Sequence, residues 1–204
     1  MTDRVTVEPE LSPDVAARTK GLRTGWTTGT CATAAAKAAA IGFVTGTAPA
    51  MVEIALPDGS RVWFPVEVSD APSVCIVVKD AGDDPDCTDG ARMTARVEDG
   101  ADGAETVLAA GAGIGTITKP GLGLPVGAPA INPVPRRMIL AAIAEVTTRP
   151  LLVTFTVPGG EAMAAETSNA RLGIVGGISI LGTTGLVRPF STAAYRASVV
   201  QQID

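Results

Sequence analysis

The chain has 204 residues, a formal net charge of −5, an aromatic content of 3% and no histidine. The acidic balance argues against nucleic acid as a partner, and the lack of histidine excludes Ser-His-Asp and Cys-His catalysis and every histidine-ligated metal site. No apolar run approaches the roughly 20 residues of a membrane helix, and the N-terminus does not resemble a signal peptide. We therefore expect a cytoplasmic protein that is not bound to membranes.

Three cysteines, Cys31, Cys75 and Cys87, are scattered along the chain. Their spacing is neither that of a zinc site nor that of a disulfide framework. We interpret each of them as a small buried or half-buried thiol, and we predict no metal site.

A flexible lead-in of residues 1–20 comes first, before a single predicted domain at 21–204. The first predicted element is a helix that begins at about Thr28 to Cys31, within "TGWTTGTCATAAAKAAA". Threonines are good capping residues and alanine is the strongest helix former. Two interpretations remain: a well-capped helix packed closely on a sheet, or a helix N-terminus that binds an anionic group with backbone N–H groups and threonine hydroxyls.

Strand signals dominate the next part of the chain. Residues 51–68 predict a hairpin that turns at Pro57–Ser60. Further strands are predicted at 73–78, 92–97 and 106–109, followed by an irregular Gly- and Pro-rich segment at 111–135. The last predicted elements are a helix at 133–147, a strand at 151–157, an apolar strand at 174–181 and a helix at 192–203. This order predicts an α+β fold with a largely antiparallel or mixed sheet and a few helices, and not a regular Rossmann domain.

The segment "VLAAGAGIG" at 107–115 looks like the glycine loop of a Rossmann site. That interpretation requires a helix directly afterwards, which Pro120, Pro125 and Pro129 forbid. The glycines can still line a ligand, because glycine permits close approach of the backbone.

The loop "KDAGDDPDCTD" at 79–89 carries five aspartates within ten residues. It could bind a hard cation, it could be an Asx-rich surface turn, or one crowded carboxylate could act as a general base. Composition alone favours the surface turn.

Basic residues in glycine-rich or turn contexts are either ordinary surface charge or a clamp for a polyanion: Lys119, Arg136, Arg137, Arg171 and Arg188. A second Thr-Thr-Gly sequence, at Thr183–Gly185, repeats the turn at Thr27–Gly29, and we predict a helix shortly after it. Two such turns are better explained by ligand contact than either one alone, although two helix caps remain possible.

Four blocks of the sequence resemble the CbiD family of cobalt-precorrin-5B C1-methyltransferases: "LRTGWTTGTCATAAAKAA", "VKDAGDDPDCTDGA", "GAGIGTITKPGLGLPVGAPAINPVPR" and "RLGIVGGISILGTTGLVRPFS". The resemblance implies methyl transfer from S-adenosylmethionine to carbon 1 of cobalt-precorrin-5B, which gives cobalt-precorrin-6A in anaerobic cobalamin biosynthesis. It implies a cobalt-precorrin as the partner, with cobalt present only in that substrate. A homo-oligomer is also possible.

The sequence departs from the family's pattern in two ways. The aspartate loop of the family commonly ends in Thr-His-Gly, whereas this loop ends in Thr88-Asp89-Gly90, which suggests that the histidine is dispensable. Family members also continue past the point where this chain stops, so we expect it to be the N-terminal portion. The alternative function is therefore a corrinoid-binding portion without catalysis of its own.

A precorrin carries many acetate and propionate groups, so helix N-termini and arginine forks are the expected contacts. Asp80 and Asp83 are the predicted catalytic residues, which take up a proton or stabilise positive charge. The predicted substrate- or donor-binding residues are Thr27, Thr28, Gly29, Thr30, Lys79, Asp84, Gly113, Gly115, Thr116, Lys119, Asn132, Arg136, Arg171, Gly182, Thr183, Thr184 and Gly185.

Overall fold

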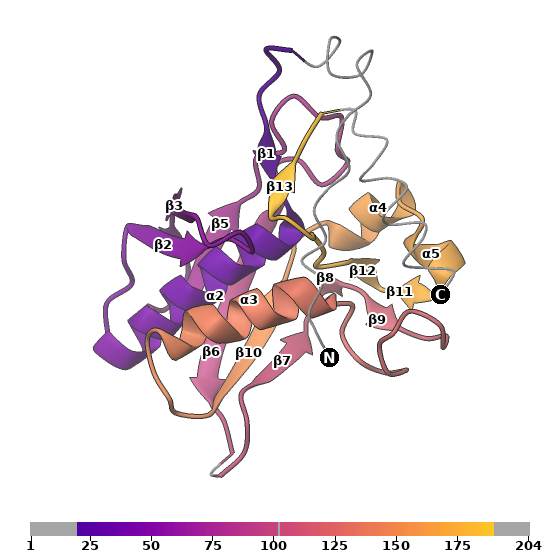
Figure 1. The fold of residues 1–204 in the computed structure, drawn as a ribbon. Coiled ribbons are helices and arrows are strands. Elements are labelled where there is room, and N and C mark those ends of the chain that lie inside the picture. The colour runs from indigo at the N-terminus through magenta and orange to yellow at the C-terminus, as the bar shows by residue number, and fades with distance from the viewer. Residues whose placement is uncertain (1–19, 102, 190–204) are drawn as a thin grey trace.

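The computed structural model describes residues 20–101 and 103–189. Its largest element is a five-stranded sheet with two helices on one face (Figure 1). The strand order is β4 (Glu67–Val68), β5 (Val74–Val78), β6 (Arg92–Asp99), β10 (Leu151–Thr156) and β7 (Val107–Ala110). All neighbours are antiparallel except β10 and β7, which are parallel. The predicted α+β class with a mixed sheet is confirmed.

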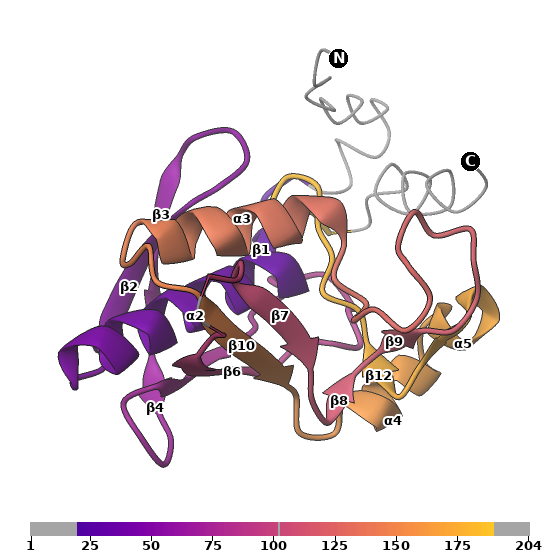
Figure 2. The same cartoon turned by 90° about the horizontal axis from the view of Figure 1, so that it is seen from below.

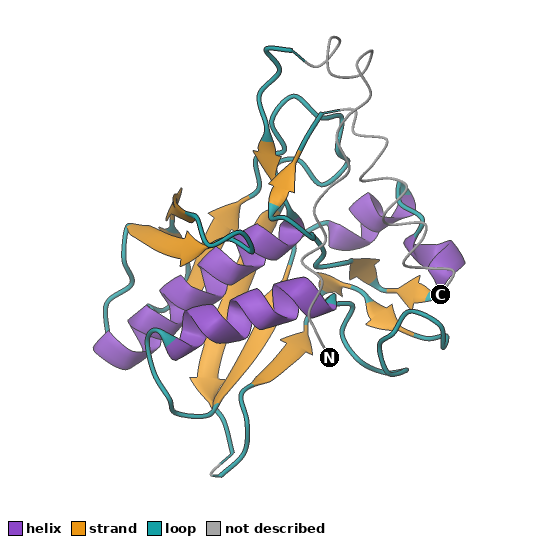
Figure 3. Ribbon diagram, viewed as in Figure 1, coloured by secondary structure: helices purple, strands orange, loops and turns teal. Residues whose placement is uncertain are grey.

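Helix α2 (Thr28–Thr45) is buried along most of its length, between the sheet, a hairpin and helix α3 (Pro133–Ala144). Figures 2 and 3 show the two helices lying together over the sheet. The start of α2 is confirmed, since Thr27 is its N-cap and accepts a hydrogen bond from the Thr30 N–H. The alanines leave little bulk on α2, so its neighbours approach closely. A Cβ at Gly42 would lie 1.8 Å from the Pro72 carbonyl oxygen.

The predicted hairpin is confirmed as β2 (Met51–Ala55) paired with β3 (Arg61–Pro65). The Leu56 N–H donates to the Ser60 carbonyl across the turn, at 2.8 Å. The second strand is shorter than predicted, because residues 67–68 leave the hairpin and form the edge strand β4 of the main sheet.

An ionic network joins α2, the hairpin and the end of α3. The half-exposed Glu145 carboxylate accepts hydrogen bonds from Lys37 Nζ at 2.5 Å and from Arg61 Nη2 at 3.0 Å. Lys37 also donates to the Glu53 carbonyl at 2.8 Å. The hydrogen bonds from Arg61 and then from Lys37 lower the pKa of Glu145 from 4.5 to about 2.

We expect Glu145→Gln to lower the free energy of unfolding at neutral pH by about 1 kcal/mol, because the site is partly exposed and screened. A lowered folded pKa stabilises the fold above the unfolded value of 4.5, and this contribution is lost as the pH falls toward about 2. Urea unfolding of wild type and Glu145→Gln from neutral to acidic pH measures this contribution, with the exposed Glu98→Gln as the control variant. A difference from wild type that does not shrink in acid would contradict the assignment.

The sheet passes at one end into a smaller unit of short strands and helices. Its elements are β8 (Gly113–Ile114), β9 (Thr116–Ile117), α4 (Gly160–Ala165), α5 (Asn169–Leu172), β11 (Ile174–Val175) and β12 (Gly177–Ile178). β12 runs parallel to β8, and β11 runs antiparallel to β9. The single strand predicted at 174–181 is wrong, because Gly176, at φ +91°, separates two strands of two residues. Helices α4 and α5 were not predicted.

Two short strands far apart in sequence, β1 (Gly25–Trp26) and β13 (Leu186–Val187), pair antiparallel. The element that follows the second Thr-Thr-Gly turn is therefore a strand. The helix predicted at 192–203 lies outside the described residues, as does the lead-in except for Lys20.

No helix follows the glycine loop until α3, which agrees with the rejection of a Rossmann site. In the part of the chain that the structure describes, no helix combines the length and apolar character required to cross a membrane.

Candidate functional site

The two Thr-Thr-Gly turns bind each other. The Thr28 hydroxyl donates to the Ser179 carbonyl at 3.0 Å and accepts from the Leu181 N–H at 2.9 Å. The Thr30 hydroxyl donates to the Gly185 carbonyl at 2.7 Å. The threonines that open α2 therefore hold the segment 179–185, and β1 and β13 extend this contact.

Three backbone N–H groups in the first turn of α2 also have partners within the chain. Gly29 donates to the Leu181 carbonyl at 2.9 Å, Thr30 to the Thr27 hydroxyl at 3.2 Å, and Cys31 to the Thr27 carbonyl at 3.1 Å. An anion site at this helix N-terminus stays a prediction, and these contacts favour the alternative of a capped, closely packed helix.

A cavity of about 350 Å³ opens beside the two turns. Its wall combines the start of α2, the aspartate loop, the connection from α4 into α5, and the chain from β12 to β13. The lining residues are Thr27, Thr28, Lys79, Asp86, Cys87, Thr88, Glu166, Thr167, Ser168, Asn169, Leu172, Ile178, Ser179, Leu181 and Val187. Three of the predicted binding residues, Thr27, Thr28 and Lys79, therefore lie on one cavity wall.

A buried ion pair forms part of that wall. Lys79 Nζ lies 2.7 Å from Asp86 Oδ2, and the side chains are 1% and 22% exposed. Asp86 Oδ1 accepts from the Thr88 N–H at 2.7 Å and from its hydroxyl at 2.6 Å. Burial raises the pKa of Asp86, but the charge of Lys79 and the hydrogen bonds outweigh it, so the pKa lies below its usual range. Asp86 is thus a fixed carboxylate at neutral pH.

The predicted catalytic aspartates lie elsewhere on the loop. Asp80 forms an exposed ion pair with Arg23, and this hydrogen bond lowers the pKa of Asp80. Asp83 accepts from the Arg23 N–H at 2.7 Å. Asp80 and Asp83 are absent from the cavity lining, as is the half-buried Asp84. The carboxylate of this loop that faces the cavity is Asp86.

The glycines of the predicted site pack against other parts of the backbone. Gly113 pairs with Gly177, and a Cβ at Gly113 would lie 2.0 Å from the Val157 carbonyl oxygen. Gly115 is buried, while Thr116 pairs with Val175. A Cβ at Gly182 would lie 2.4 Å from the Thr27 hydroxyl oxygen. Close packing therefore accounts for Gly113 and Gly182 without a ligand.

The remaining predicted residues are spread over the surface. Lys119, Arg136 and Arg171 are exposed, and among the described residues none of the three lines the cavity. Asn132 is the N-cap of α3 without a side-chain capping bond. Thr183, Thr184 and the buried Gly185 belong to the second turn, next to the cavity-lining Leu181. The predicted clamp of basic residues is not gathered at this cavity.

The cavity also includes residues that were not predicted as site residues: Asp86, Cys87, Thr88, Glu166, Asn169 and Ser179. The first three belong to the aspartate loop, so that loop was the available signal. The run Glu166–Asn169 carries a Thr-Ser-Asn turn sequence that marks a loop, but nothing in it indicates which cavity the loop faces.

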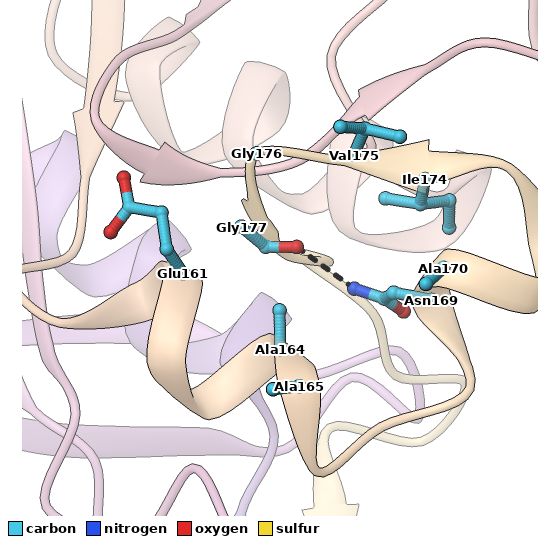
Figure 4. Close-up of a pocket in the computed structure, with 9 residues that line it drawn as sticks. All are labelled: Glu161, Ala164, Ala165, Asn169, Ala170, Ile174, Val175, Gly176 and Gly177. Atoms are coloured by element: carbon cyan, nitrogen blue, oxygen red, sulfur yellow. Dashed lines mark hydrogen bonds between the residues drawn. The ribbon is translucent and has the colours of Figure 1, made fainter.

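A second cavity, of about 190 Å³, lies between α4, α5 and the turn from β11 to β12 (Figure 4). Asn169 lines both: its amide donates to the Gly177 carbonyl at 3.0 Å and accepts from the Ser179 hydroxyl at 3.2 Å. Glu161 lines the second cavity and accepts from the Gly113 N–H at 2.7 Å. Asn169 is therefore a fixed, buried side chain in the shared wall.

Of the cysteines, Cys31 and Cys75 are buried, as expected, whereas Cys87 is exposed at the cavity. Burial raises the pKa of Cys31 to about 12, so it is a neutral thiol at physiological pH. Within residues 20–101 and 103–189, no three His, Cys, Asp or Glu residues come together as a metal site would require.

The cavity can hold a small polar ligand. Its volume is at the low end of ligand pockets, which run from roughly 300 to 1,000 Å³. The charged groups that residues 20–101 and 103–189 contribute to it are one ammonium, on Lys79, and two carboxylates, on Asp86 and Glu166, which give a formal charge of −1. Hydroxyl and amide groups supply further hydrogen bonds.

Comparisons with known proteins agree with the resemblance in the sequence. A model of the CbiD family matches residues 15–189. Proteins named cobalt-precorrin-5B C(1)-methyltransferase from Salinispora arenicola and Rubrobacter xylanophilus are 59% and 60% identical to this chain. Both alignments cover 97% of this chain and 53% of the relative, so the chain spans about half the length of these proteins.

The fold comparison points the same way. The crystal structure of a cobalamin biosynthesis protein (cbiD) from Archaeoglobus fulgidus matches with a TM-score of 0.68 and 28% identity. The match covers 95% of this chain and 68% of that chain. Since the family model spans most of the sequence and the fold agrees, this chain belongs to the CbiD family.

Proposed function

We propose that this chain carries the methyltransferase function of its relatives: transfer of a methyl group from S-adenosylmethionine to carbon 1 of cobalt-precorrin-5B, to give cobalt-precorrin-6A in anaerobic cobalamin biosynthesis. The observation that carries the proposal is the 59% identity, over 97% of the chain, to a protein with that name. The reaction would take place in the cytoplasm, with cobalt present only as part of the substrate.

The donor supplies an activated methyl group. The protein's part is to bind and orient the two reactants and to exclude water from them. Holding two reactants in a productive geometry supplies much of the rate in such a transfer. Methylation of a ring carbon also releases a proton, which a carboxylate can take up. Asp86 faces the cavity, so we place it closest to the reacting groups, and Asp80 and Asp83 remain the candidates predicted from the sequence.

The second candidate function is a corrinoid-binding portion without catalysis of its own. The observation that favours it is that the chain matches only 53% of the length of its relatives. In that case the remainder of such a protein would complete the donor site or the chemistry.

Anaerobic incubation with cobalt-precorrin-5B and methyl-labelled S-adenosylmethionine separates the two. We expect label to enter the macrocycle, and we expect Asp80→Asn and Asp83→Asn to retain turnover within about threefold, because both side chains pair with Arg23 away from the cavity. A loss of activity of more than about 100-fold in either variant, which is the range of a general base, would support the catalytic role predicted from the sequence. If no label enters the macrocycle but the corrinoid absorbance changes on binding, the result would support the second candidate function, a corrinoid-binding portion without catalysis.

A further inference from the structure

We infer that the cavity beside the Lys79–Asp86 pair binds the methyl donor, a sulfonium carrying an amino acid and a nucleoside, and not the corrinoid. The inference rests on the proposed function for the identity of the two ligands. The site itself is argued from size, charge and hydrogen-bonding groups.

Size favours the donor. The cavity holds about 350 Å³, which is within the range of small-molecule pockets. A ring-contracted tetrapyrrole with its acetate and propionate arms is more than twice as large as the donor. It could place one arm in this space, but its ring must lie outside.

Charge favours the donor more strongly. Among the described residues, the cavity wall carries one cation, Lys79, which Asp86 already neutralises, and one further carboxylate, Glu166. The donor has a sulfonium, an ammonium and a carboxylate, so its formal charge is +1 and complements the −1 of the wall. A corrinoid with many carboxylates would meet net repulsion there, since like charges at contact cost about 1 kcal/mol even in water.

The polar groups match the parts of the donor. Lys79 has three N–H donors, of which one bonds to Asp86, so the ammonium can also bind the ligand carboxylate. The carboxylates of Glu166 and Asp86 can accept hydrogen bonds from an ammonium or from ribose hydroxyls. The buried Asn169 and Ser179 are held by bonds to each other and to the Gly177 carbonyl, so this part of the wall is ordered before the ligand arrives.

Cys87 provides a test that does not depend on turnover. It is exposed and lines the cavity, whereas Cys31 and Cys75 are buried, so N-ethylmaleimide should label Cys87 first. We expect S-adenosylmethionine to slow that labelling at least tenfold, and uroporphyrin, a polycarboxylate tetrapyrrole, to leave it within about twofold. Cys87→Ser identifies the labelled position. Protection by uroporphyrin alone, or by neither compound, would overturn the inference.

Equilibrium dialysis with labelled S-adenosylmethionine tests the charge argument. We expect Glu166→Gln to weaken binding about fivefold, which corresponds to one nearby charge pair in a wet site. The matched control is Glu98→Gln, on an exposed position of β6. Equal affinity for S-adenosylmethionine in the two variants would contradict the inference.

These results are separable from the proposed function. Protection of Cys87 without methyl transfer would leave the donor site in place and refute catalysis by this chain. Methyl transfer without protection would support the function and place the donor elsewhere.

Discussion

Gly113→Ala is expected to lower the free energy of unfolding by more than about 4 kcal/mol, enough to prevent folding of a marginally stable domain. The added Cβ would lie 2.0 Å from the Val157 carbonyl oxygen, and the residue adopts φ +78°, which disfavours any side chain. The neighbours are backbone atoms, so no side chain can rotate away. Urea unfolding measures the loss, and the soluble yield reports it if the variant does not fold.

Gly127→Ala is the matched control. Gly127 has a similar φ of +86°, but a Cβ there would meet nothing within 4 Å. Its cost is the conformational strain alone, about 1 kcal/mol. The difference between the two variants isolates the crowding at Gly113. If both lose the same stability, the space at Gly113 is open, and its predicted role in close approach to a ligand would gain support.

The crowding at Gly113 matters for the cavity because three glycines meet there. A Cβ at Gly160 would lie 2.2 Å from the Gly113 carbonyl oxygen, and one at Gly177 would lie 2.1 Å from the Gly113 carbonyl carbon. This three-glycine contact joins β8 to β12 and to the start of α4. The chain from α4 onward carries Glu166 and Asn169, so a shift at Gly113 would move one wall of the cavity.

The sequence predicted the elements whose local signals agree with their packing. Helix α2 combines a threonine cap with an alanine run, and the hairpin turn at Pro57–Ser60 lies between alternating strands. β10 is rich in β-formers and buried on alternate residues. In these cases the local preference and the tertiary environment favour the same structure.

The sequence did not predict elements that only tertiary contacts define. The apolar run from Ile174 predicts one strand, yet its two halves pair with different partners, β9 and β8, around Gly176. Helix α5 has four residues, too few for a periodic pattern to appear. Such elements are stabilised by neighbours that are distant in the chain.

For the same reason, the sequence predicted only part of the candidate site. The aspartate loop was recognised from its composition, but composition cannot distinguish Asp80 and Asp83, which face Arg23, from Asp86, which faces the cavity. The threonine turns were predicted as ligand contacts, whereas the hydroxyls of Thr28 and Thr30 bind the backbone of residues 179–185, across more than 150 residues of sequence. Long-range pairing of this kind leaves no trace in one sequence.

The second large effect is expected at the Lys79–Asp86 pair. Asp86→Asn should lower the free energy of unfolding by about 3 kcal/mol, because it leaves the Lys79 ammonium, 1% exposed, without a counter-charge. Lys79→Met should cost less, about 1 to 2 kcal/mol, since Asp86 is 22% exposed and keeps its bonds from Thr88. Urea unfolding of both single variants at neutral pH measures these losses.

The pair should also give the fold a defined acid sensitivity. The folded pKa of Asp86 is lowered, so the pair stabilises the fold above the unfolded value of about 3.9, and this contribution is lost as the pH falls through the folded value. The gap in stability between wild type and Asp86→Asn should therefore close in acid. A gap that stays constant down to acid denaturation would mean that the ionised carboxylate is not what stabilises this loop.

The double variant Lys79→Met/Asp86→Asn separates stability from binding. It removes both charges, keeps the side-chain shapes and leaves an amide oxygen to accept from Thr88, so its stability should return to within about 1 kcal/mol of wild type. If Lys79 holds the ligand carboxylate, the same variant should still bind S-adenosylmethionine at least tenfold more weakly than wild type, as one lost charge-assisted hydrogen bond predicts. A stable double variant with unchanged affinity would show that the ion pair only supports the loop, and the donor would then have to be held by other groups.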